Sequence, residues 1–279
     1  MPSHTSISID DLVRLIGTPD CPVILNVCID DDFSLDPRFI PGSVRRSHKQ
    51  ISDARTAQEF AGRSVVIYCQ RGEKLSQGAA AWLRHQGVSA RNVEGGFEAW
   101  RKAGLPLVRS EIVPPRDQQG RTVWVTRERP KVDRIACPWL IRRFIDPHAV
   151  FLFVEASQVA LVADRFAATP FDIDWVFWSH RGERCTFDTM VEEFGLHCDA
   201  LDRLATIVRG ADTARPDLAP EAPGLLAASL GLSRLISDDL RQLEAGMTLY
   251  DSFYLWCRDA AQETHNWPAT KPQTSKVPA

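Results

Sequence analysis

Two kinds of hydrophobic pattern alternate along the first hundred residues. Short runs of apolar residues have the length of buried strands, and the stretches between them have the spacing of amphipathic helices. The strand-like runs lie at 23–27, 64–68 and 90–93, and helical stretches begin near residues 9, 75 and 97. Strands that alternate with helices predict an α/β domain, a parallel sheet with helices on both faces. An acidic stretch at 30–39 interrupts the pattern and is predicted to be a surface loop.

The pattern changes in the second half. Strand-like runs at 122–126, 150–154 and 175–178 are interspersed with helical stretches at 133–145 and 157–166. From residue 186 the spacing is helical almost throughout, over 186–195, 199–210, 221–236 and 238–258. We predict an α+β domain with a small sheet and a largely helical C-terminal half. Its tryptophans, among them Trp175 and Trp178, are expected in the core.

A stretch rich in proline and charge separates the two patterns. It contains Pro114-Pro115 and predicts a linker over 109–121. The first domain is then expected over 5–108 and the second over 122–262. The last residues, 263–279, are polar and contain prolines, so we expect a flexible tail there.

Composition narrows the class of protein. The 279 residues are enough for two domains of roughly 150 residues each. The net charge of −3 argues against nucleic acid as the main partner. We expect neither a signal peptide nor a membrane span, because the start lacks a basic segment with an apolar core and no run approaches about 18 apolar residues. The seven cysteines are scattered without a CxxC pair, which favours reduced thiols and a cytoplasmic location.

One cysteine lies where a strand should end and a helix should begin. Cys69 directly follows the apolar run 64–68, and helical spacing resumes about six residues later. Loop amides and the helix dipole at such a junction favour a thiolate and an anionic substrate. Cys69 is therefore a candidate nucleophile, although a buried inert thiol is the alternative interpretation. The candidate substrate-binding residues are Gln70, Arg71, Gly72, Glu73, Lys74, Leu75 and Ser76.

Three motifs in this order resemble those of a rhodanese domain. They are Ile40-Pro41-Gly42-Ser43, the block from Tyr68 to Ala80 around Cys69, and Gly95-Gly96-Phe97-Glu98-Ala99-Trp100. The resemblance covers about 5–108 and implies a rhodanese-like fold with sulfurtransferase activity. Cys69 would then carry a sulfane sulfur as a persulfide. The donor would be a small molecule such as thiosulfate, the acceptor a thiol or cyanide, and the transfer would need no cofactor.

The loop sequence refines this expectation. Rhodanese-like phosphatases carry an arginine after five intervening residues, and Leu75 stands there, which argues against phosphate-ester chemistry. Lys74 is placed to hold the sulfonate end of a donor, or it is a solvated lysine. Asn26 and Cys28 stand where rhodaneses usually have the aspartate and arginine that support the loop. Cys28 is also a candidate second thiol near Cys69.

Several blocks of the second half resemble the C-terminal domain of bacterial chromate-resistance proteins. They include DRIACPWLIRRFIDPHA (133–149), HRGERCTFD (180–188) and IVRGADT (207–213). The resemblance covers about 122–260. It implies a cytosolic role in the response to chromate, either in detoxification or in sensing.

Charged side chains in these blocks suggest two kinds of site. Asp133 begins a predicted helix, and His180 and Glu183 follow a later strand. If the strands are neighbours, these three residues converge at one sheet edge and are candidate ligands for a divalent metal. Arg134 and Arg181 are candidates for binding an oxyanion. A structural ion-pair network is the third interpretation. The same blocks also contain the polar groups of Cys137, Cys185 and Asp212.

Three functions are consistent with these residues. The first is a rhodanese-type sulfurtransferase coupled to a chromate-response domain. The second is a non-catalytic sensor or regulator that binds chromate, a tetrahedral dianion, at the loop amides or at the arginines of the second domain. The third is a thiol-based chromate reductase that uses Cys69 with Cys28 or another thiol.

Overall fold

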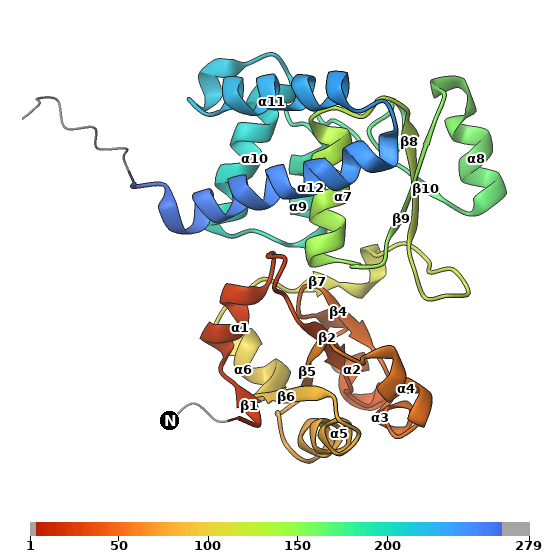
Figure 1. The fold of residues 1–279 in the computed structure, drawn as a ribbon, viewed down its shortest axis with the longest axis vertical. Helices are drawn as coiled ribbons and strands as arrows, with labels where there is room; N and C mark the ends of the chain where they lie inside the picture. The colour runs from red at the N-terminus through yellow and green to blue at the C-terminus, as the bar shows by residue number, and fades with distance from the viewer. Residues whose placement is uncertain (1–3, 264–279) are drawn as a thin grey trace, which may run out of the picture.

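The first part of the chain folds around a five-stranded parallel sheet, as the alternating pattern predicts. The computed structural model describes residues 4–263 (Figure 1). The strand order is β1–β6–β5–β2–β4, and neighbouring strands pair in parallel. The strands are β1 (Ser6–Ile7), β2 (Val23–Asn26), β4 (Ser43–Arg45), β5 (Ser64–Tyr68) and β6 (Ser89–Val93).

Helices cover both faces of this sheet (Figure 1). One face carries α1 (Ile9–Leu15) and α6 (Gly96–Lys102). The other carries α3 (His48–Ile51), α4 (Ala54–Glu59) and α5 (Lys74–His85). The α/β architecture predicted for this part is therefore confirmed.

Side chains of β5 alternate between the two faces with the two-residue period of a strand. Val66 and Tyr68 belong to the hydrophobic core on the side of α1 and α6. Val65, Ile67 and Cys69 belong to the cluster on the side of α5. The period thus places the thiol of Cys69 on the α5 face.

The prediction of a surface loop at 30–39 is wrong. Its residues form helix α2 (Asp30–Leu35) and strand β3 (Arg38–Phe39), which pairs antiparallel with β7 (Val108–Arg109). Three aspartates occupy the first turn of α2, where negative charge interacts favourably with the helix dipole. The acidic composition therefore marks the start of a helix here.

A three-stranded parallel sheet organises the second part. Its order is β10–β8–β9, formed by β8 (Val123–Arg127), β9 (Val150–Val154) and β10 (Thr169–Pro170). Helix α8 (Val159–Phe166) packs on one face through Val159. The remaining helices are α7 (Asp133–Phe144), α9 (Thr186–Phe194), α10 (Asp199–Asp212), α11 (Ala222–Leu235) and α12 (Asp239–Leu255). The predicted small sheet and helical C-terminal half are confirmed.

The prediction of a strand at 175–178 is wrong. These residues lie in a turn, with positive φ at Asp172 and Trp175, and only Trp178 makes an isolated bridge, to Phe171. Trp178 is buried and stacks on Phe194, with ring centroids 4.6 Å apart. Trp175, predicted to lie in the core, is fully exposed. An apolar run does not become a strand where the backbone reverses direction.

The stretch predicted as the linker touches both parts of the molecule. It runs from β7 through a short 3-10 turn, Ser110–Ile112, to β8. Arg109 donates to the peptide oxygen of Glu193 at 2.8 Å, and Arg116 lies 3.1 Å from the buried carboxylate of Asp146. The predicted tail at 263–279 lies outside the described residues, except for its first residue.

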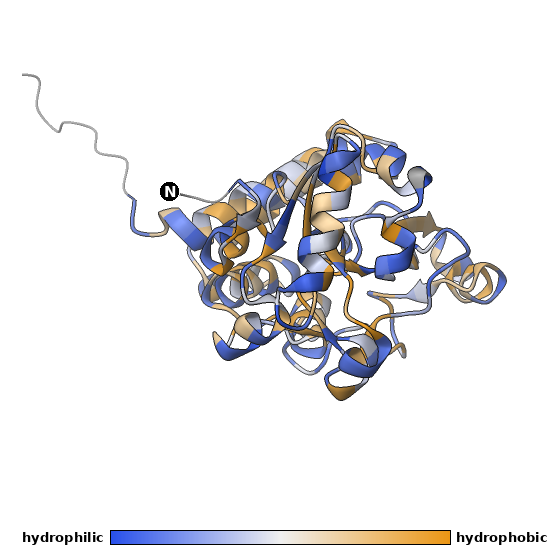
Figure 2. Cartoon of the chain, turned by 90° about the horizontal axis from the view of Figure 1, so that it is seen from below, coloured by the Kyte–Doolittle hydropathy of each residue, from blue (hydrophilic) through white to orange (hydrophobic). Residues whose placement is uncertain are grey.

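One hydrophobic core joins the two parts. It contains Ile16 from the first part and Phe144 and Tyr254 from the second. Figure 2 shows hydrophobic and hydrophilic residues interspersed along the helices and strands. Gly17 lies at this junction with φ of +81°, and a Cβ there would lie 2.5 Å from Cζ of Phe144 and 2.7 Å from Cε1 of Tyr254. The amide of Gly42 also donates to the peptide oxygen of Phe144. The two parts therefore pack as one body.

We expect Gly17→Ala to lower the free energy of unfolding by about 2–4 kcal/mol, because the methyl group both strains the left-handed backbone and overpacks the junction. Urea denaturation followed by tryptophan fluorescence measures this loss.

Gly62→Ala is the matched control. Gly62 has φ of +72°, and a Cβ there would have no atom within 4 Å, so only backbone strain of about 1 kcal/mol is expected. Equal losses in the two variants would contradict a tightly packed junction.

Candidate functional site

Cys69 lies at the carboxyl end of β5, the central strand of the first sheet. Its side chain is buried, and its Sγ lies 3.2 Å from Oγ of Ser76 in the first turn of α5. The hydroxyl of Ser76 also reaches the peptide oxygen of Glu73 at 3.2 Å. Ligands of parallel sheets bind at this end of the strands, so the predicted cysteine has the expected place.

Glycines allow the loop after Cys69 to lie directly on the turn before α6. Gly72 has φ of +70°, and a Cβ there would lie 2.5 Å from the oxygen of Val93 and 2.6 Å from the nitrogen of Gly96. A Cβ on Gly96 would overlap the oxygen of Cys69 and the nitrogen of Gly72. The peptide oxygen of Cys69 accepts a hydrogen bond from the amide of Phe97 at 3.0 Å. The loop after Cys69 and the turn before α6 thus pack backbone against backbone.

The other predicted loop residues surround the thiol differently. The peptide oxygen of Gln70 accepts from the amide of Glu98, and Arg71 lies 3.5 Å from the same glutamate while 71% of its side chain is exposed. Glu73 and Lys74 are also exposed, whereas Leu75 packs against the core cluster that contains Cys69. Only Ser76 among these side chains is placed against the thiol. Lys74 and Arg71 add positive charge at the surface of the loop.

A residue that the sequence did not single out supports the end of β2. Arg45, at the end of neighbouring β4, donates to the peptide oxygen of Cys28 at 3.2 Å and to Asp30 at 2.6 Å. Oδ1 of Asn26 accepts from the amide of Cys28 at 2.9 Å. An arginine therefore does stand at this strand end, but it comes from the adjacent strand. The sequence feature that could have pointed to Arg45 is its position, two residues after the Ile40-Pro41-Gly42-Ser43 motif.

The thiol of Cys28 is buried close to Cys69. Burial raises the pKa of Cys28 to about 12, and the neighbouring Cys69 contributes in the same direction. Cys28 therefore stays protonated at neutral pH and is a weak nucleophile.

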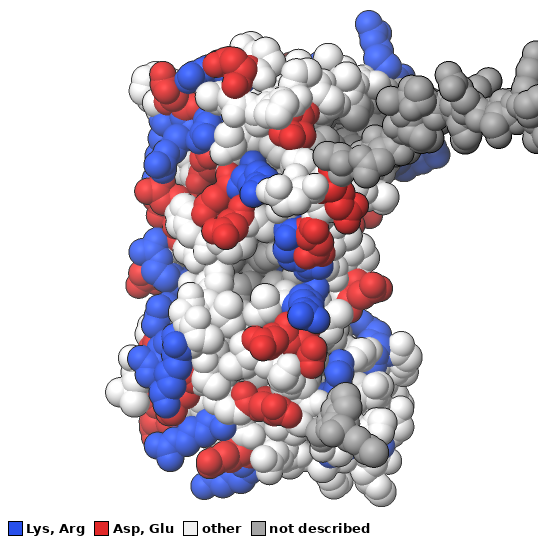
Figure 3. All heavy atoms as spheres, turned by 90° about the vertical axis from the view of Figure 1, so that its left-hand side faces the viewer, with Lys and Arg blue, Asp and Glu red and all other residues white. Residues whose placement is uncertain are grey.

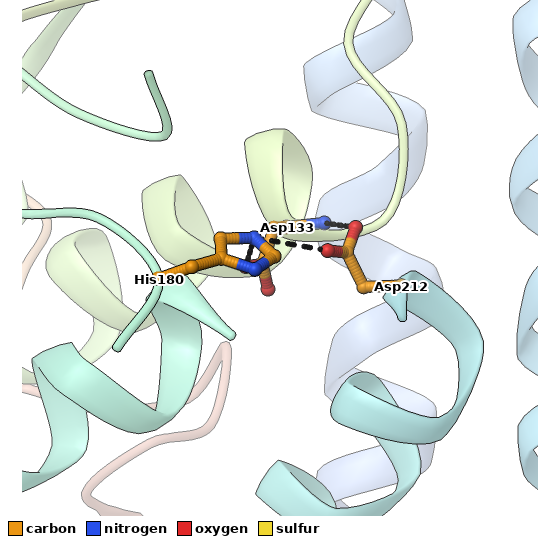
Figure 4. A group of neighbouring side chains, drawn as sticks. All are labelled: Asp133, His180 and Asp212. Carbon is orange, nitrogen blue, oxygen red and sulfur yellow. Dashed lines mark hydrogen bonds and ion pairs between the residues drawn. The ribbon is translucent and has the colours of Figure 1, made fainter. Parts of the chain in front are cut away.

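A second polar cluster lies at helix ends of the second part (Figure 4). Nε2 of His180 lies 3.2 Å from Oδ2 of Asp212, 3.4 Å from Oδ1 of Asp172 and 3.5 Å from Oδ2 of Asp133. Asp133 is the first residue of α7, Asp212 is the last residue of α10, and Asp172 and His180 lie in the loops between β10 and α9. We call these four residues the Asp–His cluster.

Hydrogen bonds and an ion pair hold the aspartates of the Asp–His cluster in place. Asp133 is fully buried, and its Oδ2 accepts from the amide of Thr186 at 2.6 Å, which satisfies the start of α9. Oδ1 of Asp172 accepts from the hydroxyl of Thr186 at 2.9 Å, and its Oδ2 lies 3.3 Å from Nε of Arg134. The amide of Asp133 donates to Asp212. Three separate elements therefore converge on one point.

The charges of the Asp–His cluster perturb one another. Hydrogen bonds to Asp172 and Asp212 raise the pKa of His180 to about 10. Burial raises the pKa of Asp133 well above its usual range, and the carboxylates of Asp212 and Asp172 add to this effect. Ionisable groups with strongly shifted equilibria at one place are typical of a functional site.

Several predicted residues lie away from the Asp–His cluster. The side chain of Glu183 is 85% exposed and pairs with Arg215 at 3.1 Å, because the backbone reverses between Arg181 and Arg184. Arg181 pairs with Glu193 and lies over the ring of Phe177. Arg134 pairs with Asp172, so the two arginines do not form a common anion site.

The structure thus changes the predicted set of converging residues. It brings Asp133 and His180 together, adds Asp212 and Asp172, and leaves Glu183 at the surface. Asp212 is one of the polar groups in the sequence blocks of this part. Asp172 was missed as a site residue, although it lies in the short block Phe171-Asp172-Ile173, which belongs to the same resemblance.

Comparison with known families identifies both parts of the chain. Residues 8–103 match the family described as "Rhodanese-like domain", and residues 124–257 match "ChrB, C-terminal domain". The chain combines a rhodanese-like domain with a ChrB C-terminal domain. Both resemblances seen in the sequence are confirmed, and we call the two parts the rhodanese-like domain and the ChrB-type domain.

Individual relatives cover one domain or a part of the chain. "Protein ChrB" of Cupriavidus metallidurans is 42% identical over 142 residues, which are 50% of this chain and 42% of that protein. A "Sulfurtransferase" of Allochromatium vinosum is 46% identical over 50 residues, 18% of this chain and 46% of the relative. "Thiosulfate sulfurtransferase GlpE" of Vibrio cholerae is 48% identical over 44 residues, 15% and 41% of the two chains. The chain spans less than half the length of each of these relatives.

The Cys69 loop therefore belongs to the rhodanese-like domain, and the Asp–His cluster belongs to the ChrB-type domain. Within the described range 4–263, no helix combines the length and the hydrophobicity needed to cross a membrane.

We expect Cys28 to resist alkylation by iodoacetamide at pH 8 in the folded protein. With a pKa of about 12, roughly one Cys28 side chain in ten thousand is ionised at that pH. Peptide mass spectrometry after a short reaction measures the modified fraction.

The same reaction in urea provides the control, because unfolding restores an ordinary thiol pKa and Cys28 should then be modified. Rapid alkylation of Cys28 in the folded protein would contradict the raised pKa and would favour a pair of reactive thiols.

Proposed function

We propose that the rhodanese-like domain is a sulfurtransferase that carries a persulfide on Cys69. The observation that carries the proposal is the position of its thiol, at the carboxyl end of the central strand and against the first turn of α5. The match to the rhodanese-like family supports it. So do the partial similarities to the relatives named sulfurtransferase and thiosulfate sulfurtransferase.

The start of α5 suits an anionic intermediate. Glu73 precedes this twelve-residue helix without a side-chain hydrogen bond to its first amides. Such free amides, together with the helix dipole, stabilise an anion at the helix start. The outer sulfur of a persulfide is an anion, so this arrangement can hold it without a metal.

The proposed reaction proceeds in two balanced steps. The Cys69 thiolate attacks the outer sulfur of thiosulfate, a new S–S bond forms, and sulfite leaves with the electron pair of the broken bond. The acceptor, cyanide or a thiolate, then attacks the outer sulfur of the persulfide. Thiocyanate or a new persulfide forms, and the Cys69 thiolate is regenerated. No oxidant or reductant is consumed in the cycle with cyanide.

Lys74 and Arg71 are the cations that we assign to the donor. Both are exposed, Arg71 in the loop and Lys74 at the start of α5, and the ion pair of Arg71 with Glu98 is long, at 3.5 Å. Each can approach the sulfonate oxygens of thiosulfate from solvent. In this role they would affect donor binding more than the transfer of sulfur to the acceptor.

For the whole chain we propose a cytoplasmic role in the response to chromate. The support is the match of residues 124–257 to the ChrB C-terminal domain and the resemblance of its sequence blocks to chromate-resistance proteins. Acidic and basic side chains are interspersed on the face shown in Figure 3, which offers no broad basic surface for nucleic acid on that side. Arg134 and Arg181 are already paired with Asp172 and Glu193. A tetrahedral anion such as chromate would therefore bind more readily at the Cys69 loop than at these arginines.

We expect a mass increase of one sulfur atom on the peptide containing Cys69 after incubation with thiosulfate. The increase should disappear on addition of cyanide, with release of thiocyanate. Cys69→Ser should abolish both signals, because serine cannot form a persulfide. Whole-protein and peptide mass spectrometry, with a colorimetric thiocyanate assay, measure the two steps.

Cys198→Ser is the matched control, since this half-buried cysteine lies in the ChrB-type domain. It should retain the persulfide on Cys69 and the release of thiocyanate. A wild-type protein that forms no persulfide with thiosulfate or mercaptopyruvate, but melts at a higher temperature with chromate, would replace the proposal with the sensor function.

A further inference from the structure

We propose that the Asp–His cluster binds one divalent metal ion, with His180, Asp212 and Asp133 as its ligands and Asp172 beside the imidazole. This site is independent of the sulfurtransferase proposal, because it lies in the other domain and shares no residue with the Cys69 loop. The observation that carries the inference is the convergence of three carboxylates on one imidazole nitrogen.

The distances from the imidazole nitrogen of His180 to the carboxylates are compatible with a shared metal ion. The Nε2 atom of His180 lies 3.2–3.5 Å from one oxygen of each of the three aspartates. Metal bonds to nitrogen and oxygen of about 2.0–2.2 Å place neighbouring ligand atoms of a tetrahedral ion about 3.3–3.6 Å apart. Ligand atoms of Asp133, His180 and Asp212 all lie within 4.8 Å of one another, and Figure 4 shows these three side chains pointing toward one another.

The hydrogen bonds of the cluster leave acceptors in excess. A single N–H on Nε2 can point well at only one carboxylate, yet three lie at similar distances. Oδ1 of Asp133 has no hydrogen-bond partner, although the residue is fully buried. Buried carboxylate oxygens are normally hydrogen-bonded or bound to a metal. A cation would satisfy several of these acceptors at once.

Local cations do not neutralise the three carboxylates evenly. Arg134 and Arg127 approach the cluster only at Oδ2 of Asp172, at 3.3 and 3.7 Å. Among the described residues, the nearby carboxylates of Asp133 and Asp212 have ion pairs only with His180. Additional positive charge beside His180 would therefore stabilise these two carboxylates.

The cluster also has a route for entry of an ion. The side chain of His180 is 40% exposed and that of Asp212 is 20% exposed, whereas Asp133 is completely buried. A metal would therefore be held from below by the buried aspartate and could keep a water ligand on the open side, as ions with a chemical role do.

The donor set selects a class of metal. Carboxylate oxygens with one imidazole suit Mn²⁺, Fe²⁺ or Zn²⁺. Ca²⁺ prefers oxygen ligands alone, and Mg²⁺ retains most of its water. Cys137 and Cys185 are buried in the surrounding core and are not among the side chains that converge with His180.

The experiment uses the full chain, treated with EDTA and then titrated with Mn²⁺ or Zn²⁺. Loss of the aqueous Mn²⁺ signal in electron paramagnetic resonance measures free manganese, and dialysis with elemental analysis measures bound zinc. We expect one ion per chain. His180→Ala and Asp212→Asn should weaken binding roughly tenfold or more, since each removes a ligand. Both residues are partly exposed, so the variants should fold.

Two control variants separate the site from nonspecific binding. Glu183→Gln removes the exposed acid that the sequence pointed to, and His197→Ala removes a histidine paired with Asp202 outside the cluster. Both should bind like wild type. Circular dichroism confirms the fold of each variant. The proposal would be overturned if neither Mn²⁺ nor Zn²⁺ bound stoichiometrically to the wild-type protein. Unchanged binding in the folded His180→Ala and Asp212→Asn variants would overturn it too.

Discussion

The packing of the two domains against each other is the constraint on which both candidate sites depend. Phe144 ends helix α7 inside the common core, beside Gly17 of the rhodanese-like domain. The same helix begins at Asp133, so its position at the junction also fixes the Asp–His cluster at its other end. Burial of apolar area across the junction therefore orients residues that are themselves polar.

The same core reaches the Cys69 loop through β5. Tyr68 is fully buried in it, and its hydroxyl lies 3.0 Å from Oγ of Ser43 and 3.3 Å from the amide of Ile40. The next residue is Cys69, whose side chain turns to the opposite face because strand side chains alternate. The backbone that carries the thiol is thus fixed on one side of the sheet, while Ser76 in the first turn of α5 contacts the thiol on the other side. A rigid base of this kind is what the proposed persulfide on Cys69 requires.

The two sites use different physical means to hold charge. Around Cys69 the backbone is the main polar element, and glycines at 72 and 96 let peptide groups approach closely where any side chain would intervene. The Asp–His cluster instead relies on side chains from separate elements, held by the first amides of α9. A site made of backbone leaves a recognisable local motif, whereas one made of dispersed side chains does not.

The two domain types, the parallel sheet of the first and the position of Cys69 at a strand end all follow from the sequence alone. These features depend on local periods and contiguous motifs, which one chain segment carries by itself. Tertiary packing was needed to bring Asp212 and Asp172, rather than Glu183, to Asp133 and His180. It also places Arg45 beside Cys28 and makes a turn of the apolar run that ends at Trp178. Such outcomes depend on backbone reversals and on contacts between distant segments, and no local pattern of residue types specifies them.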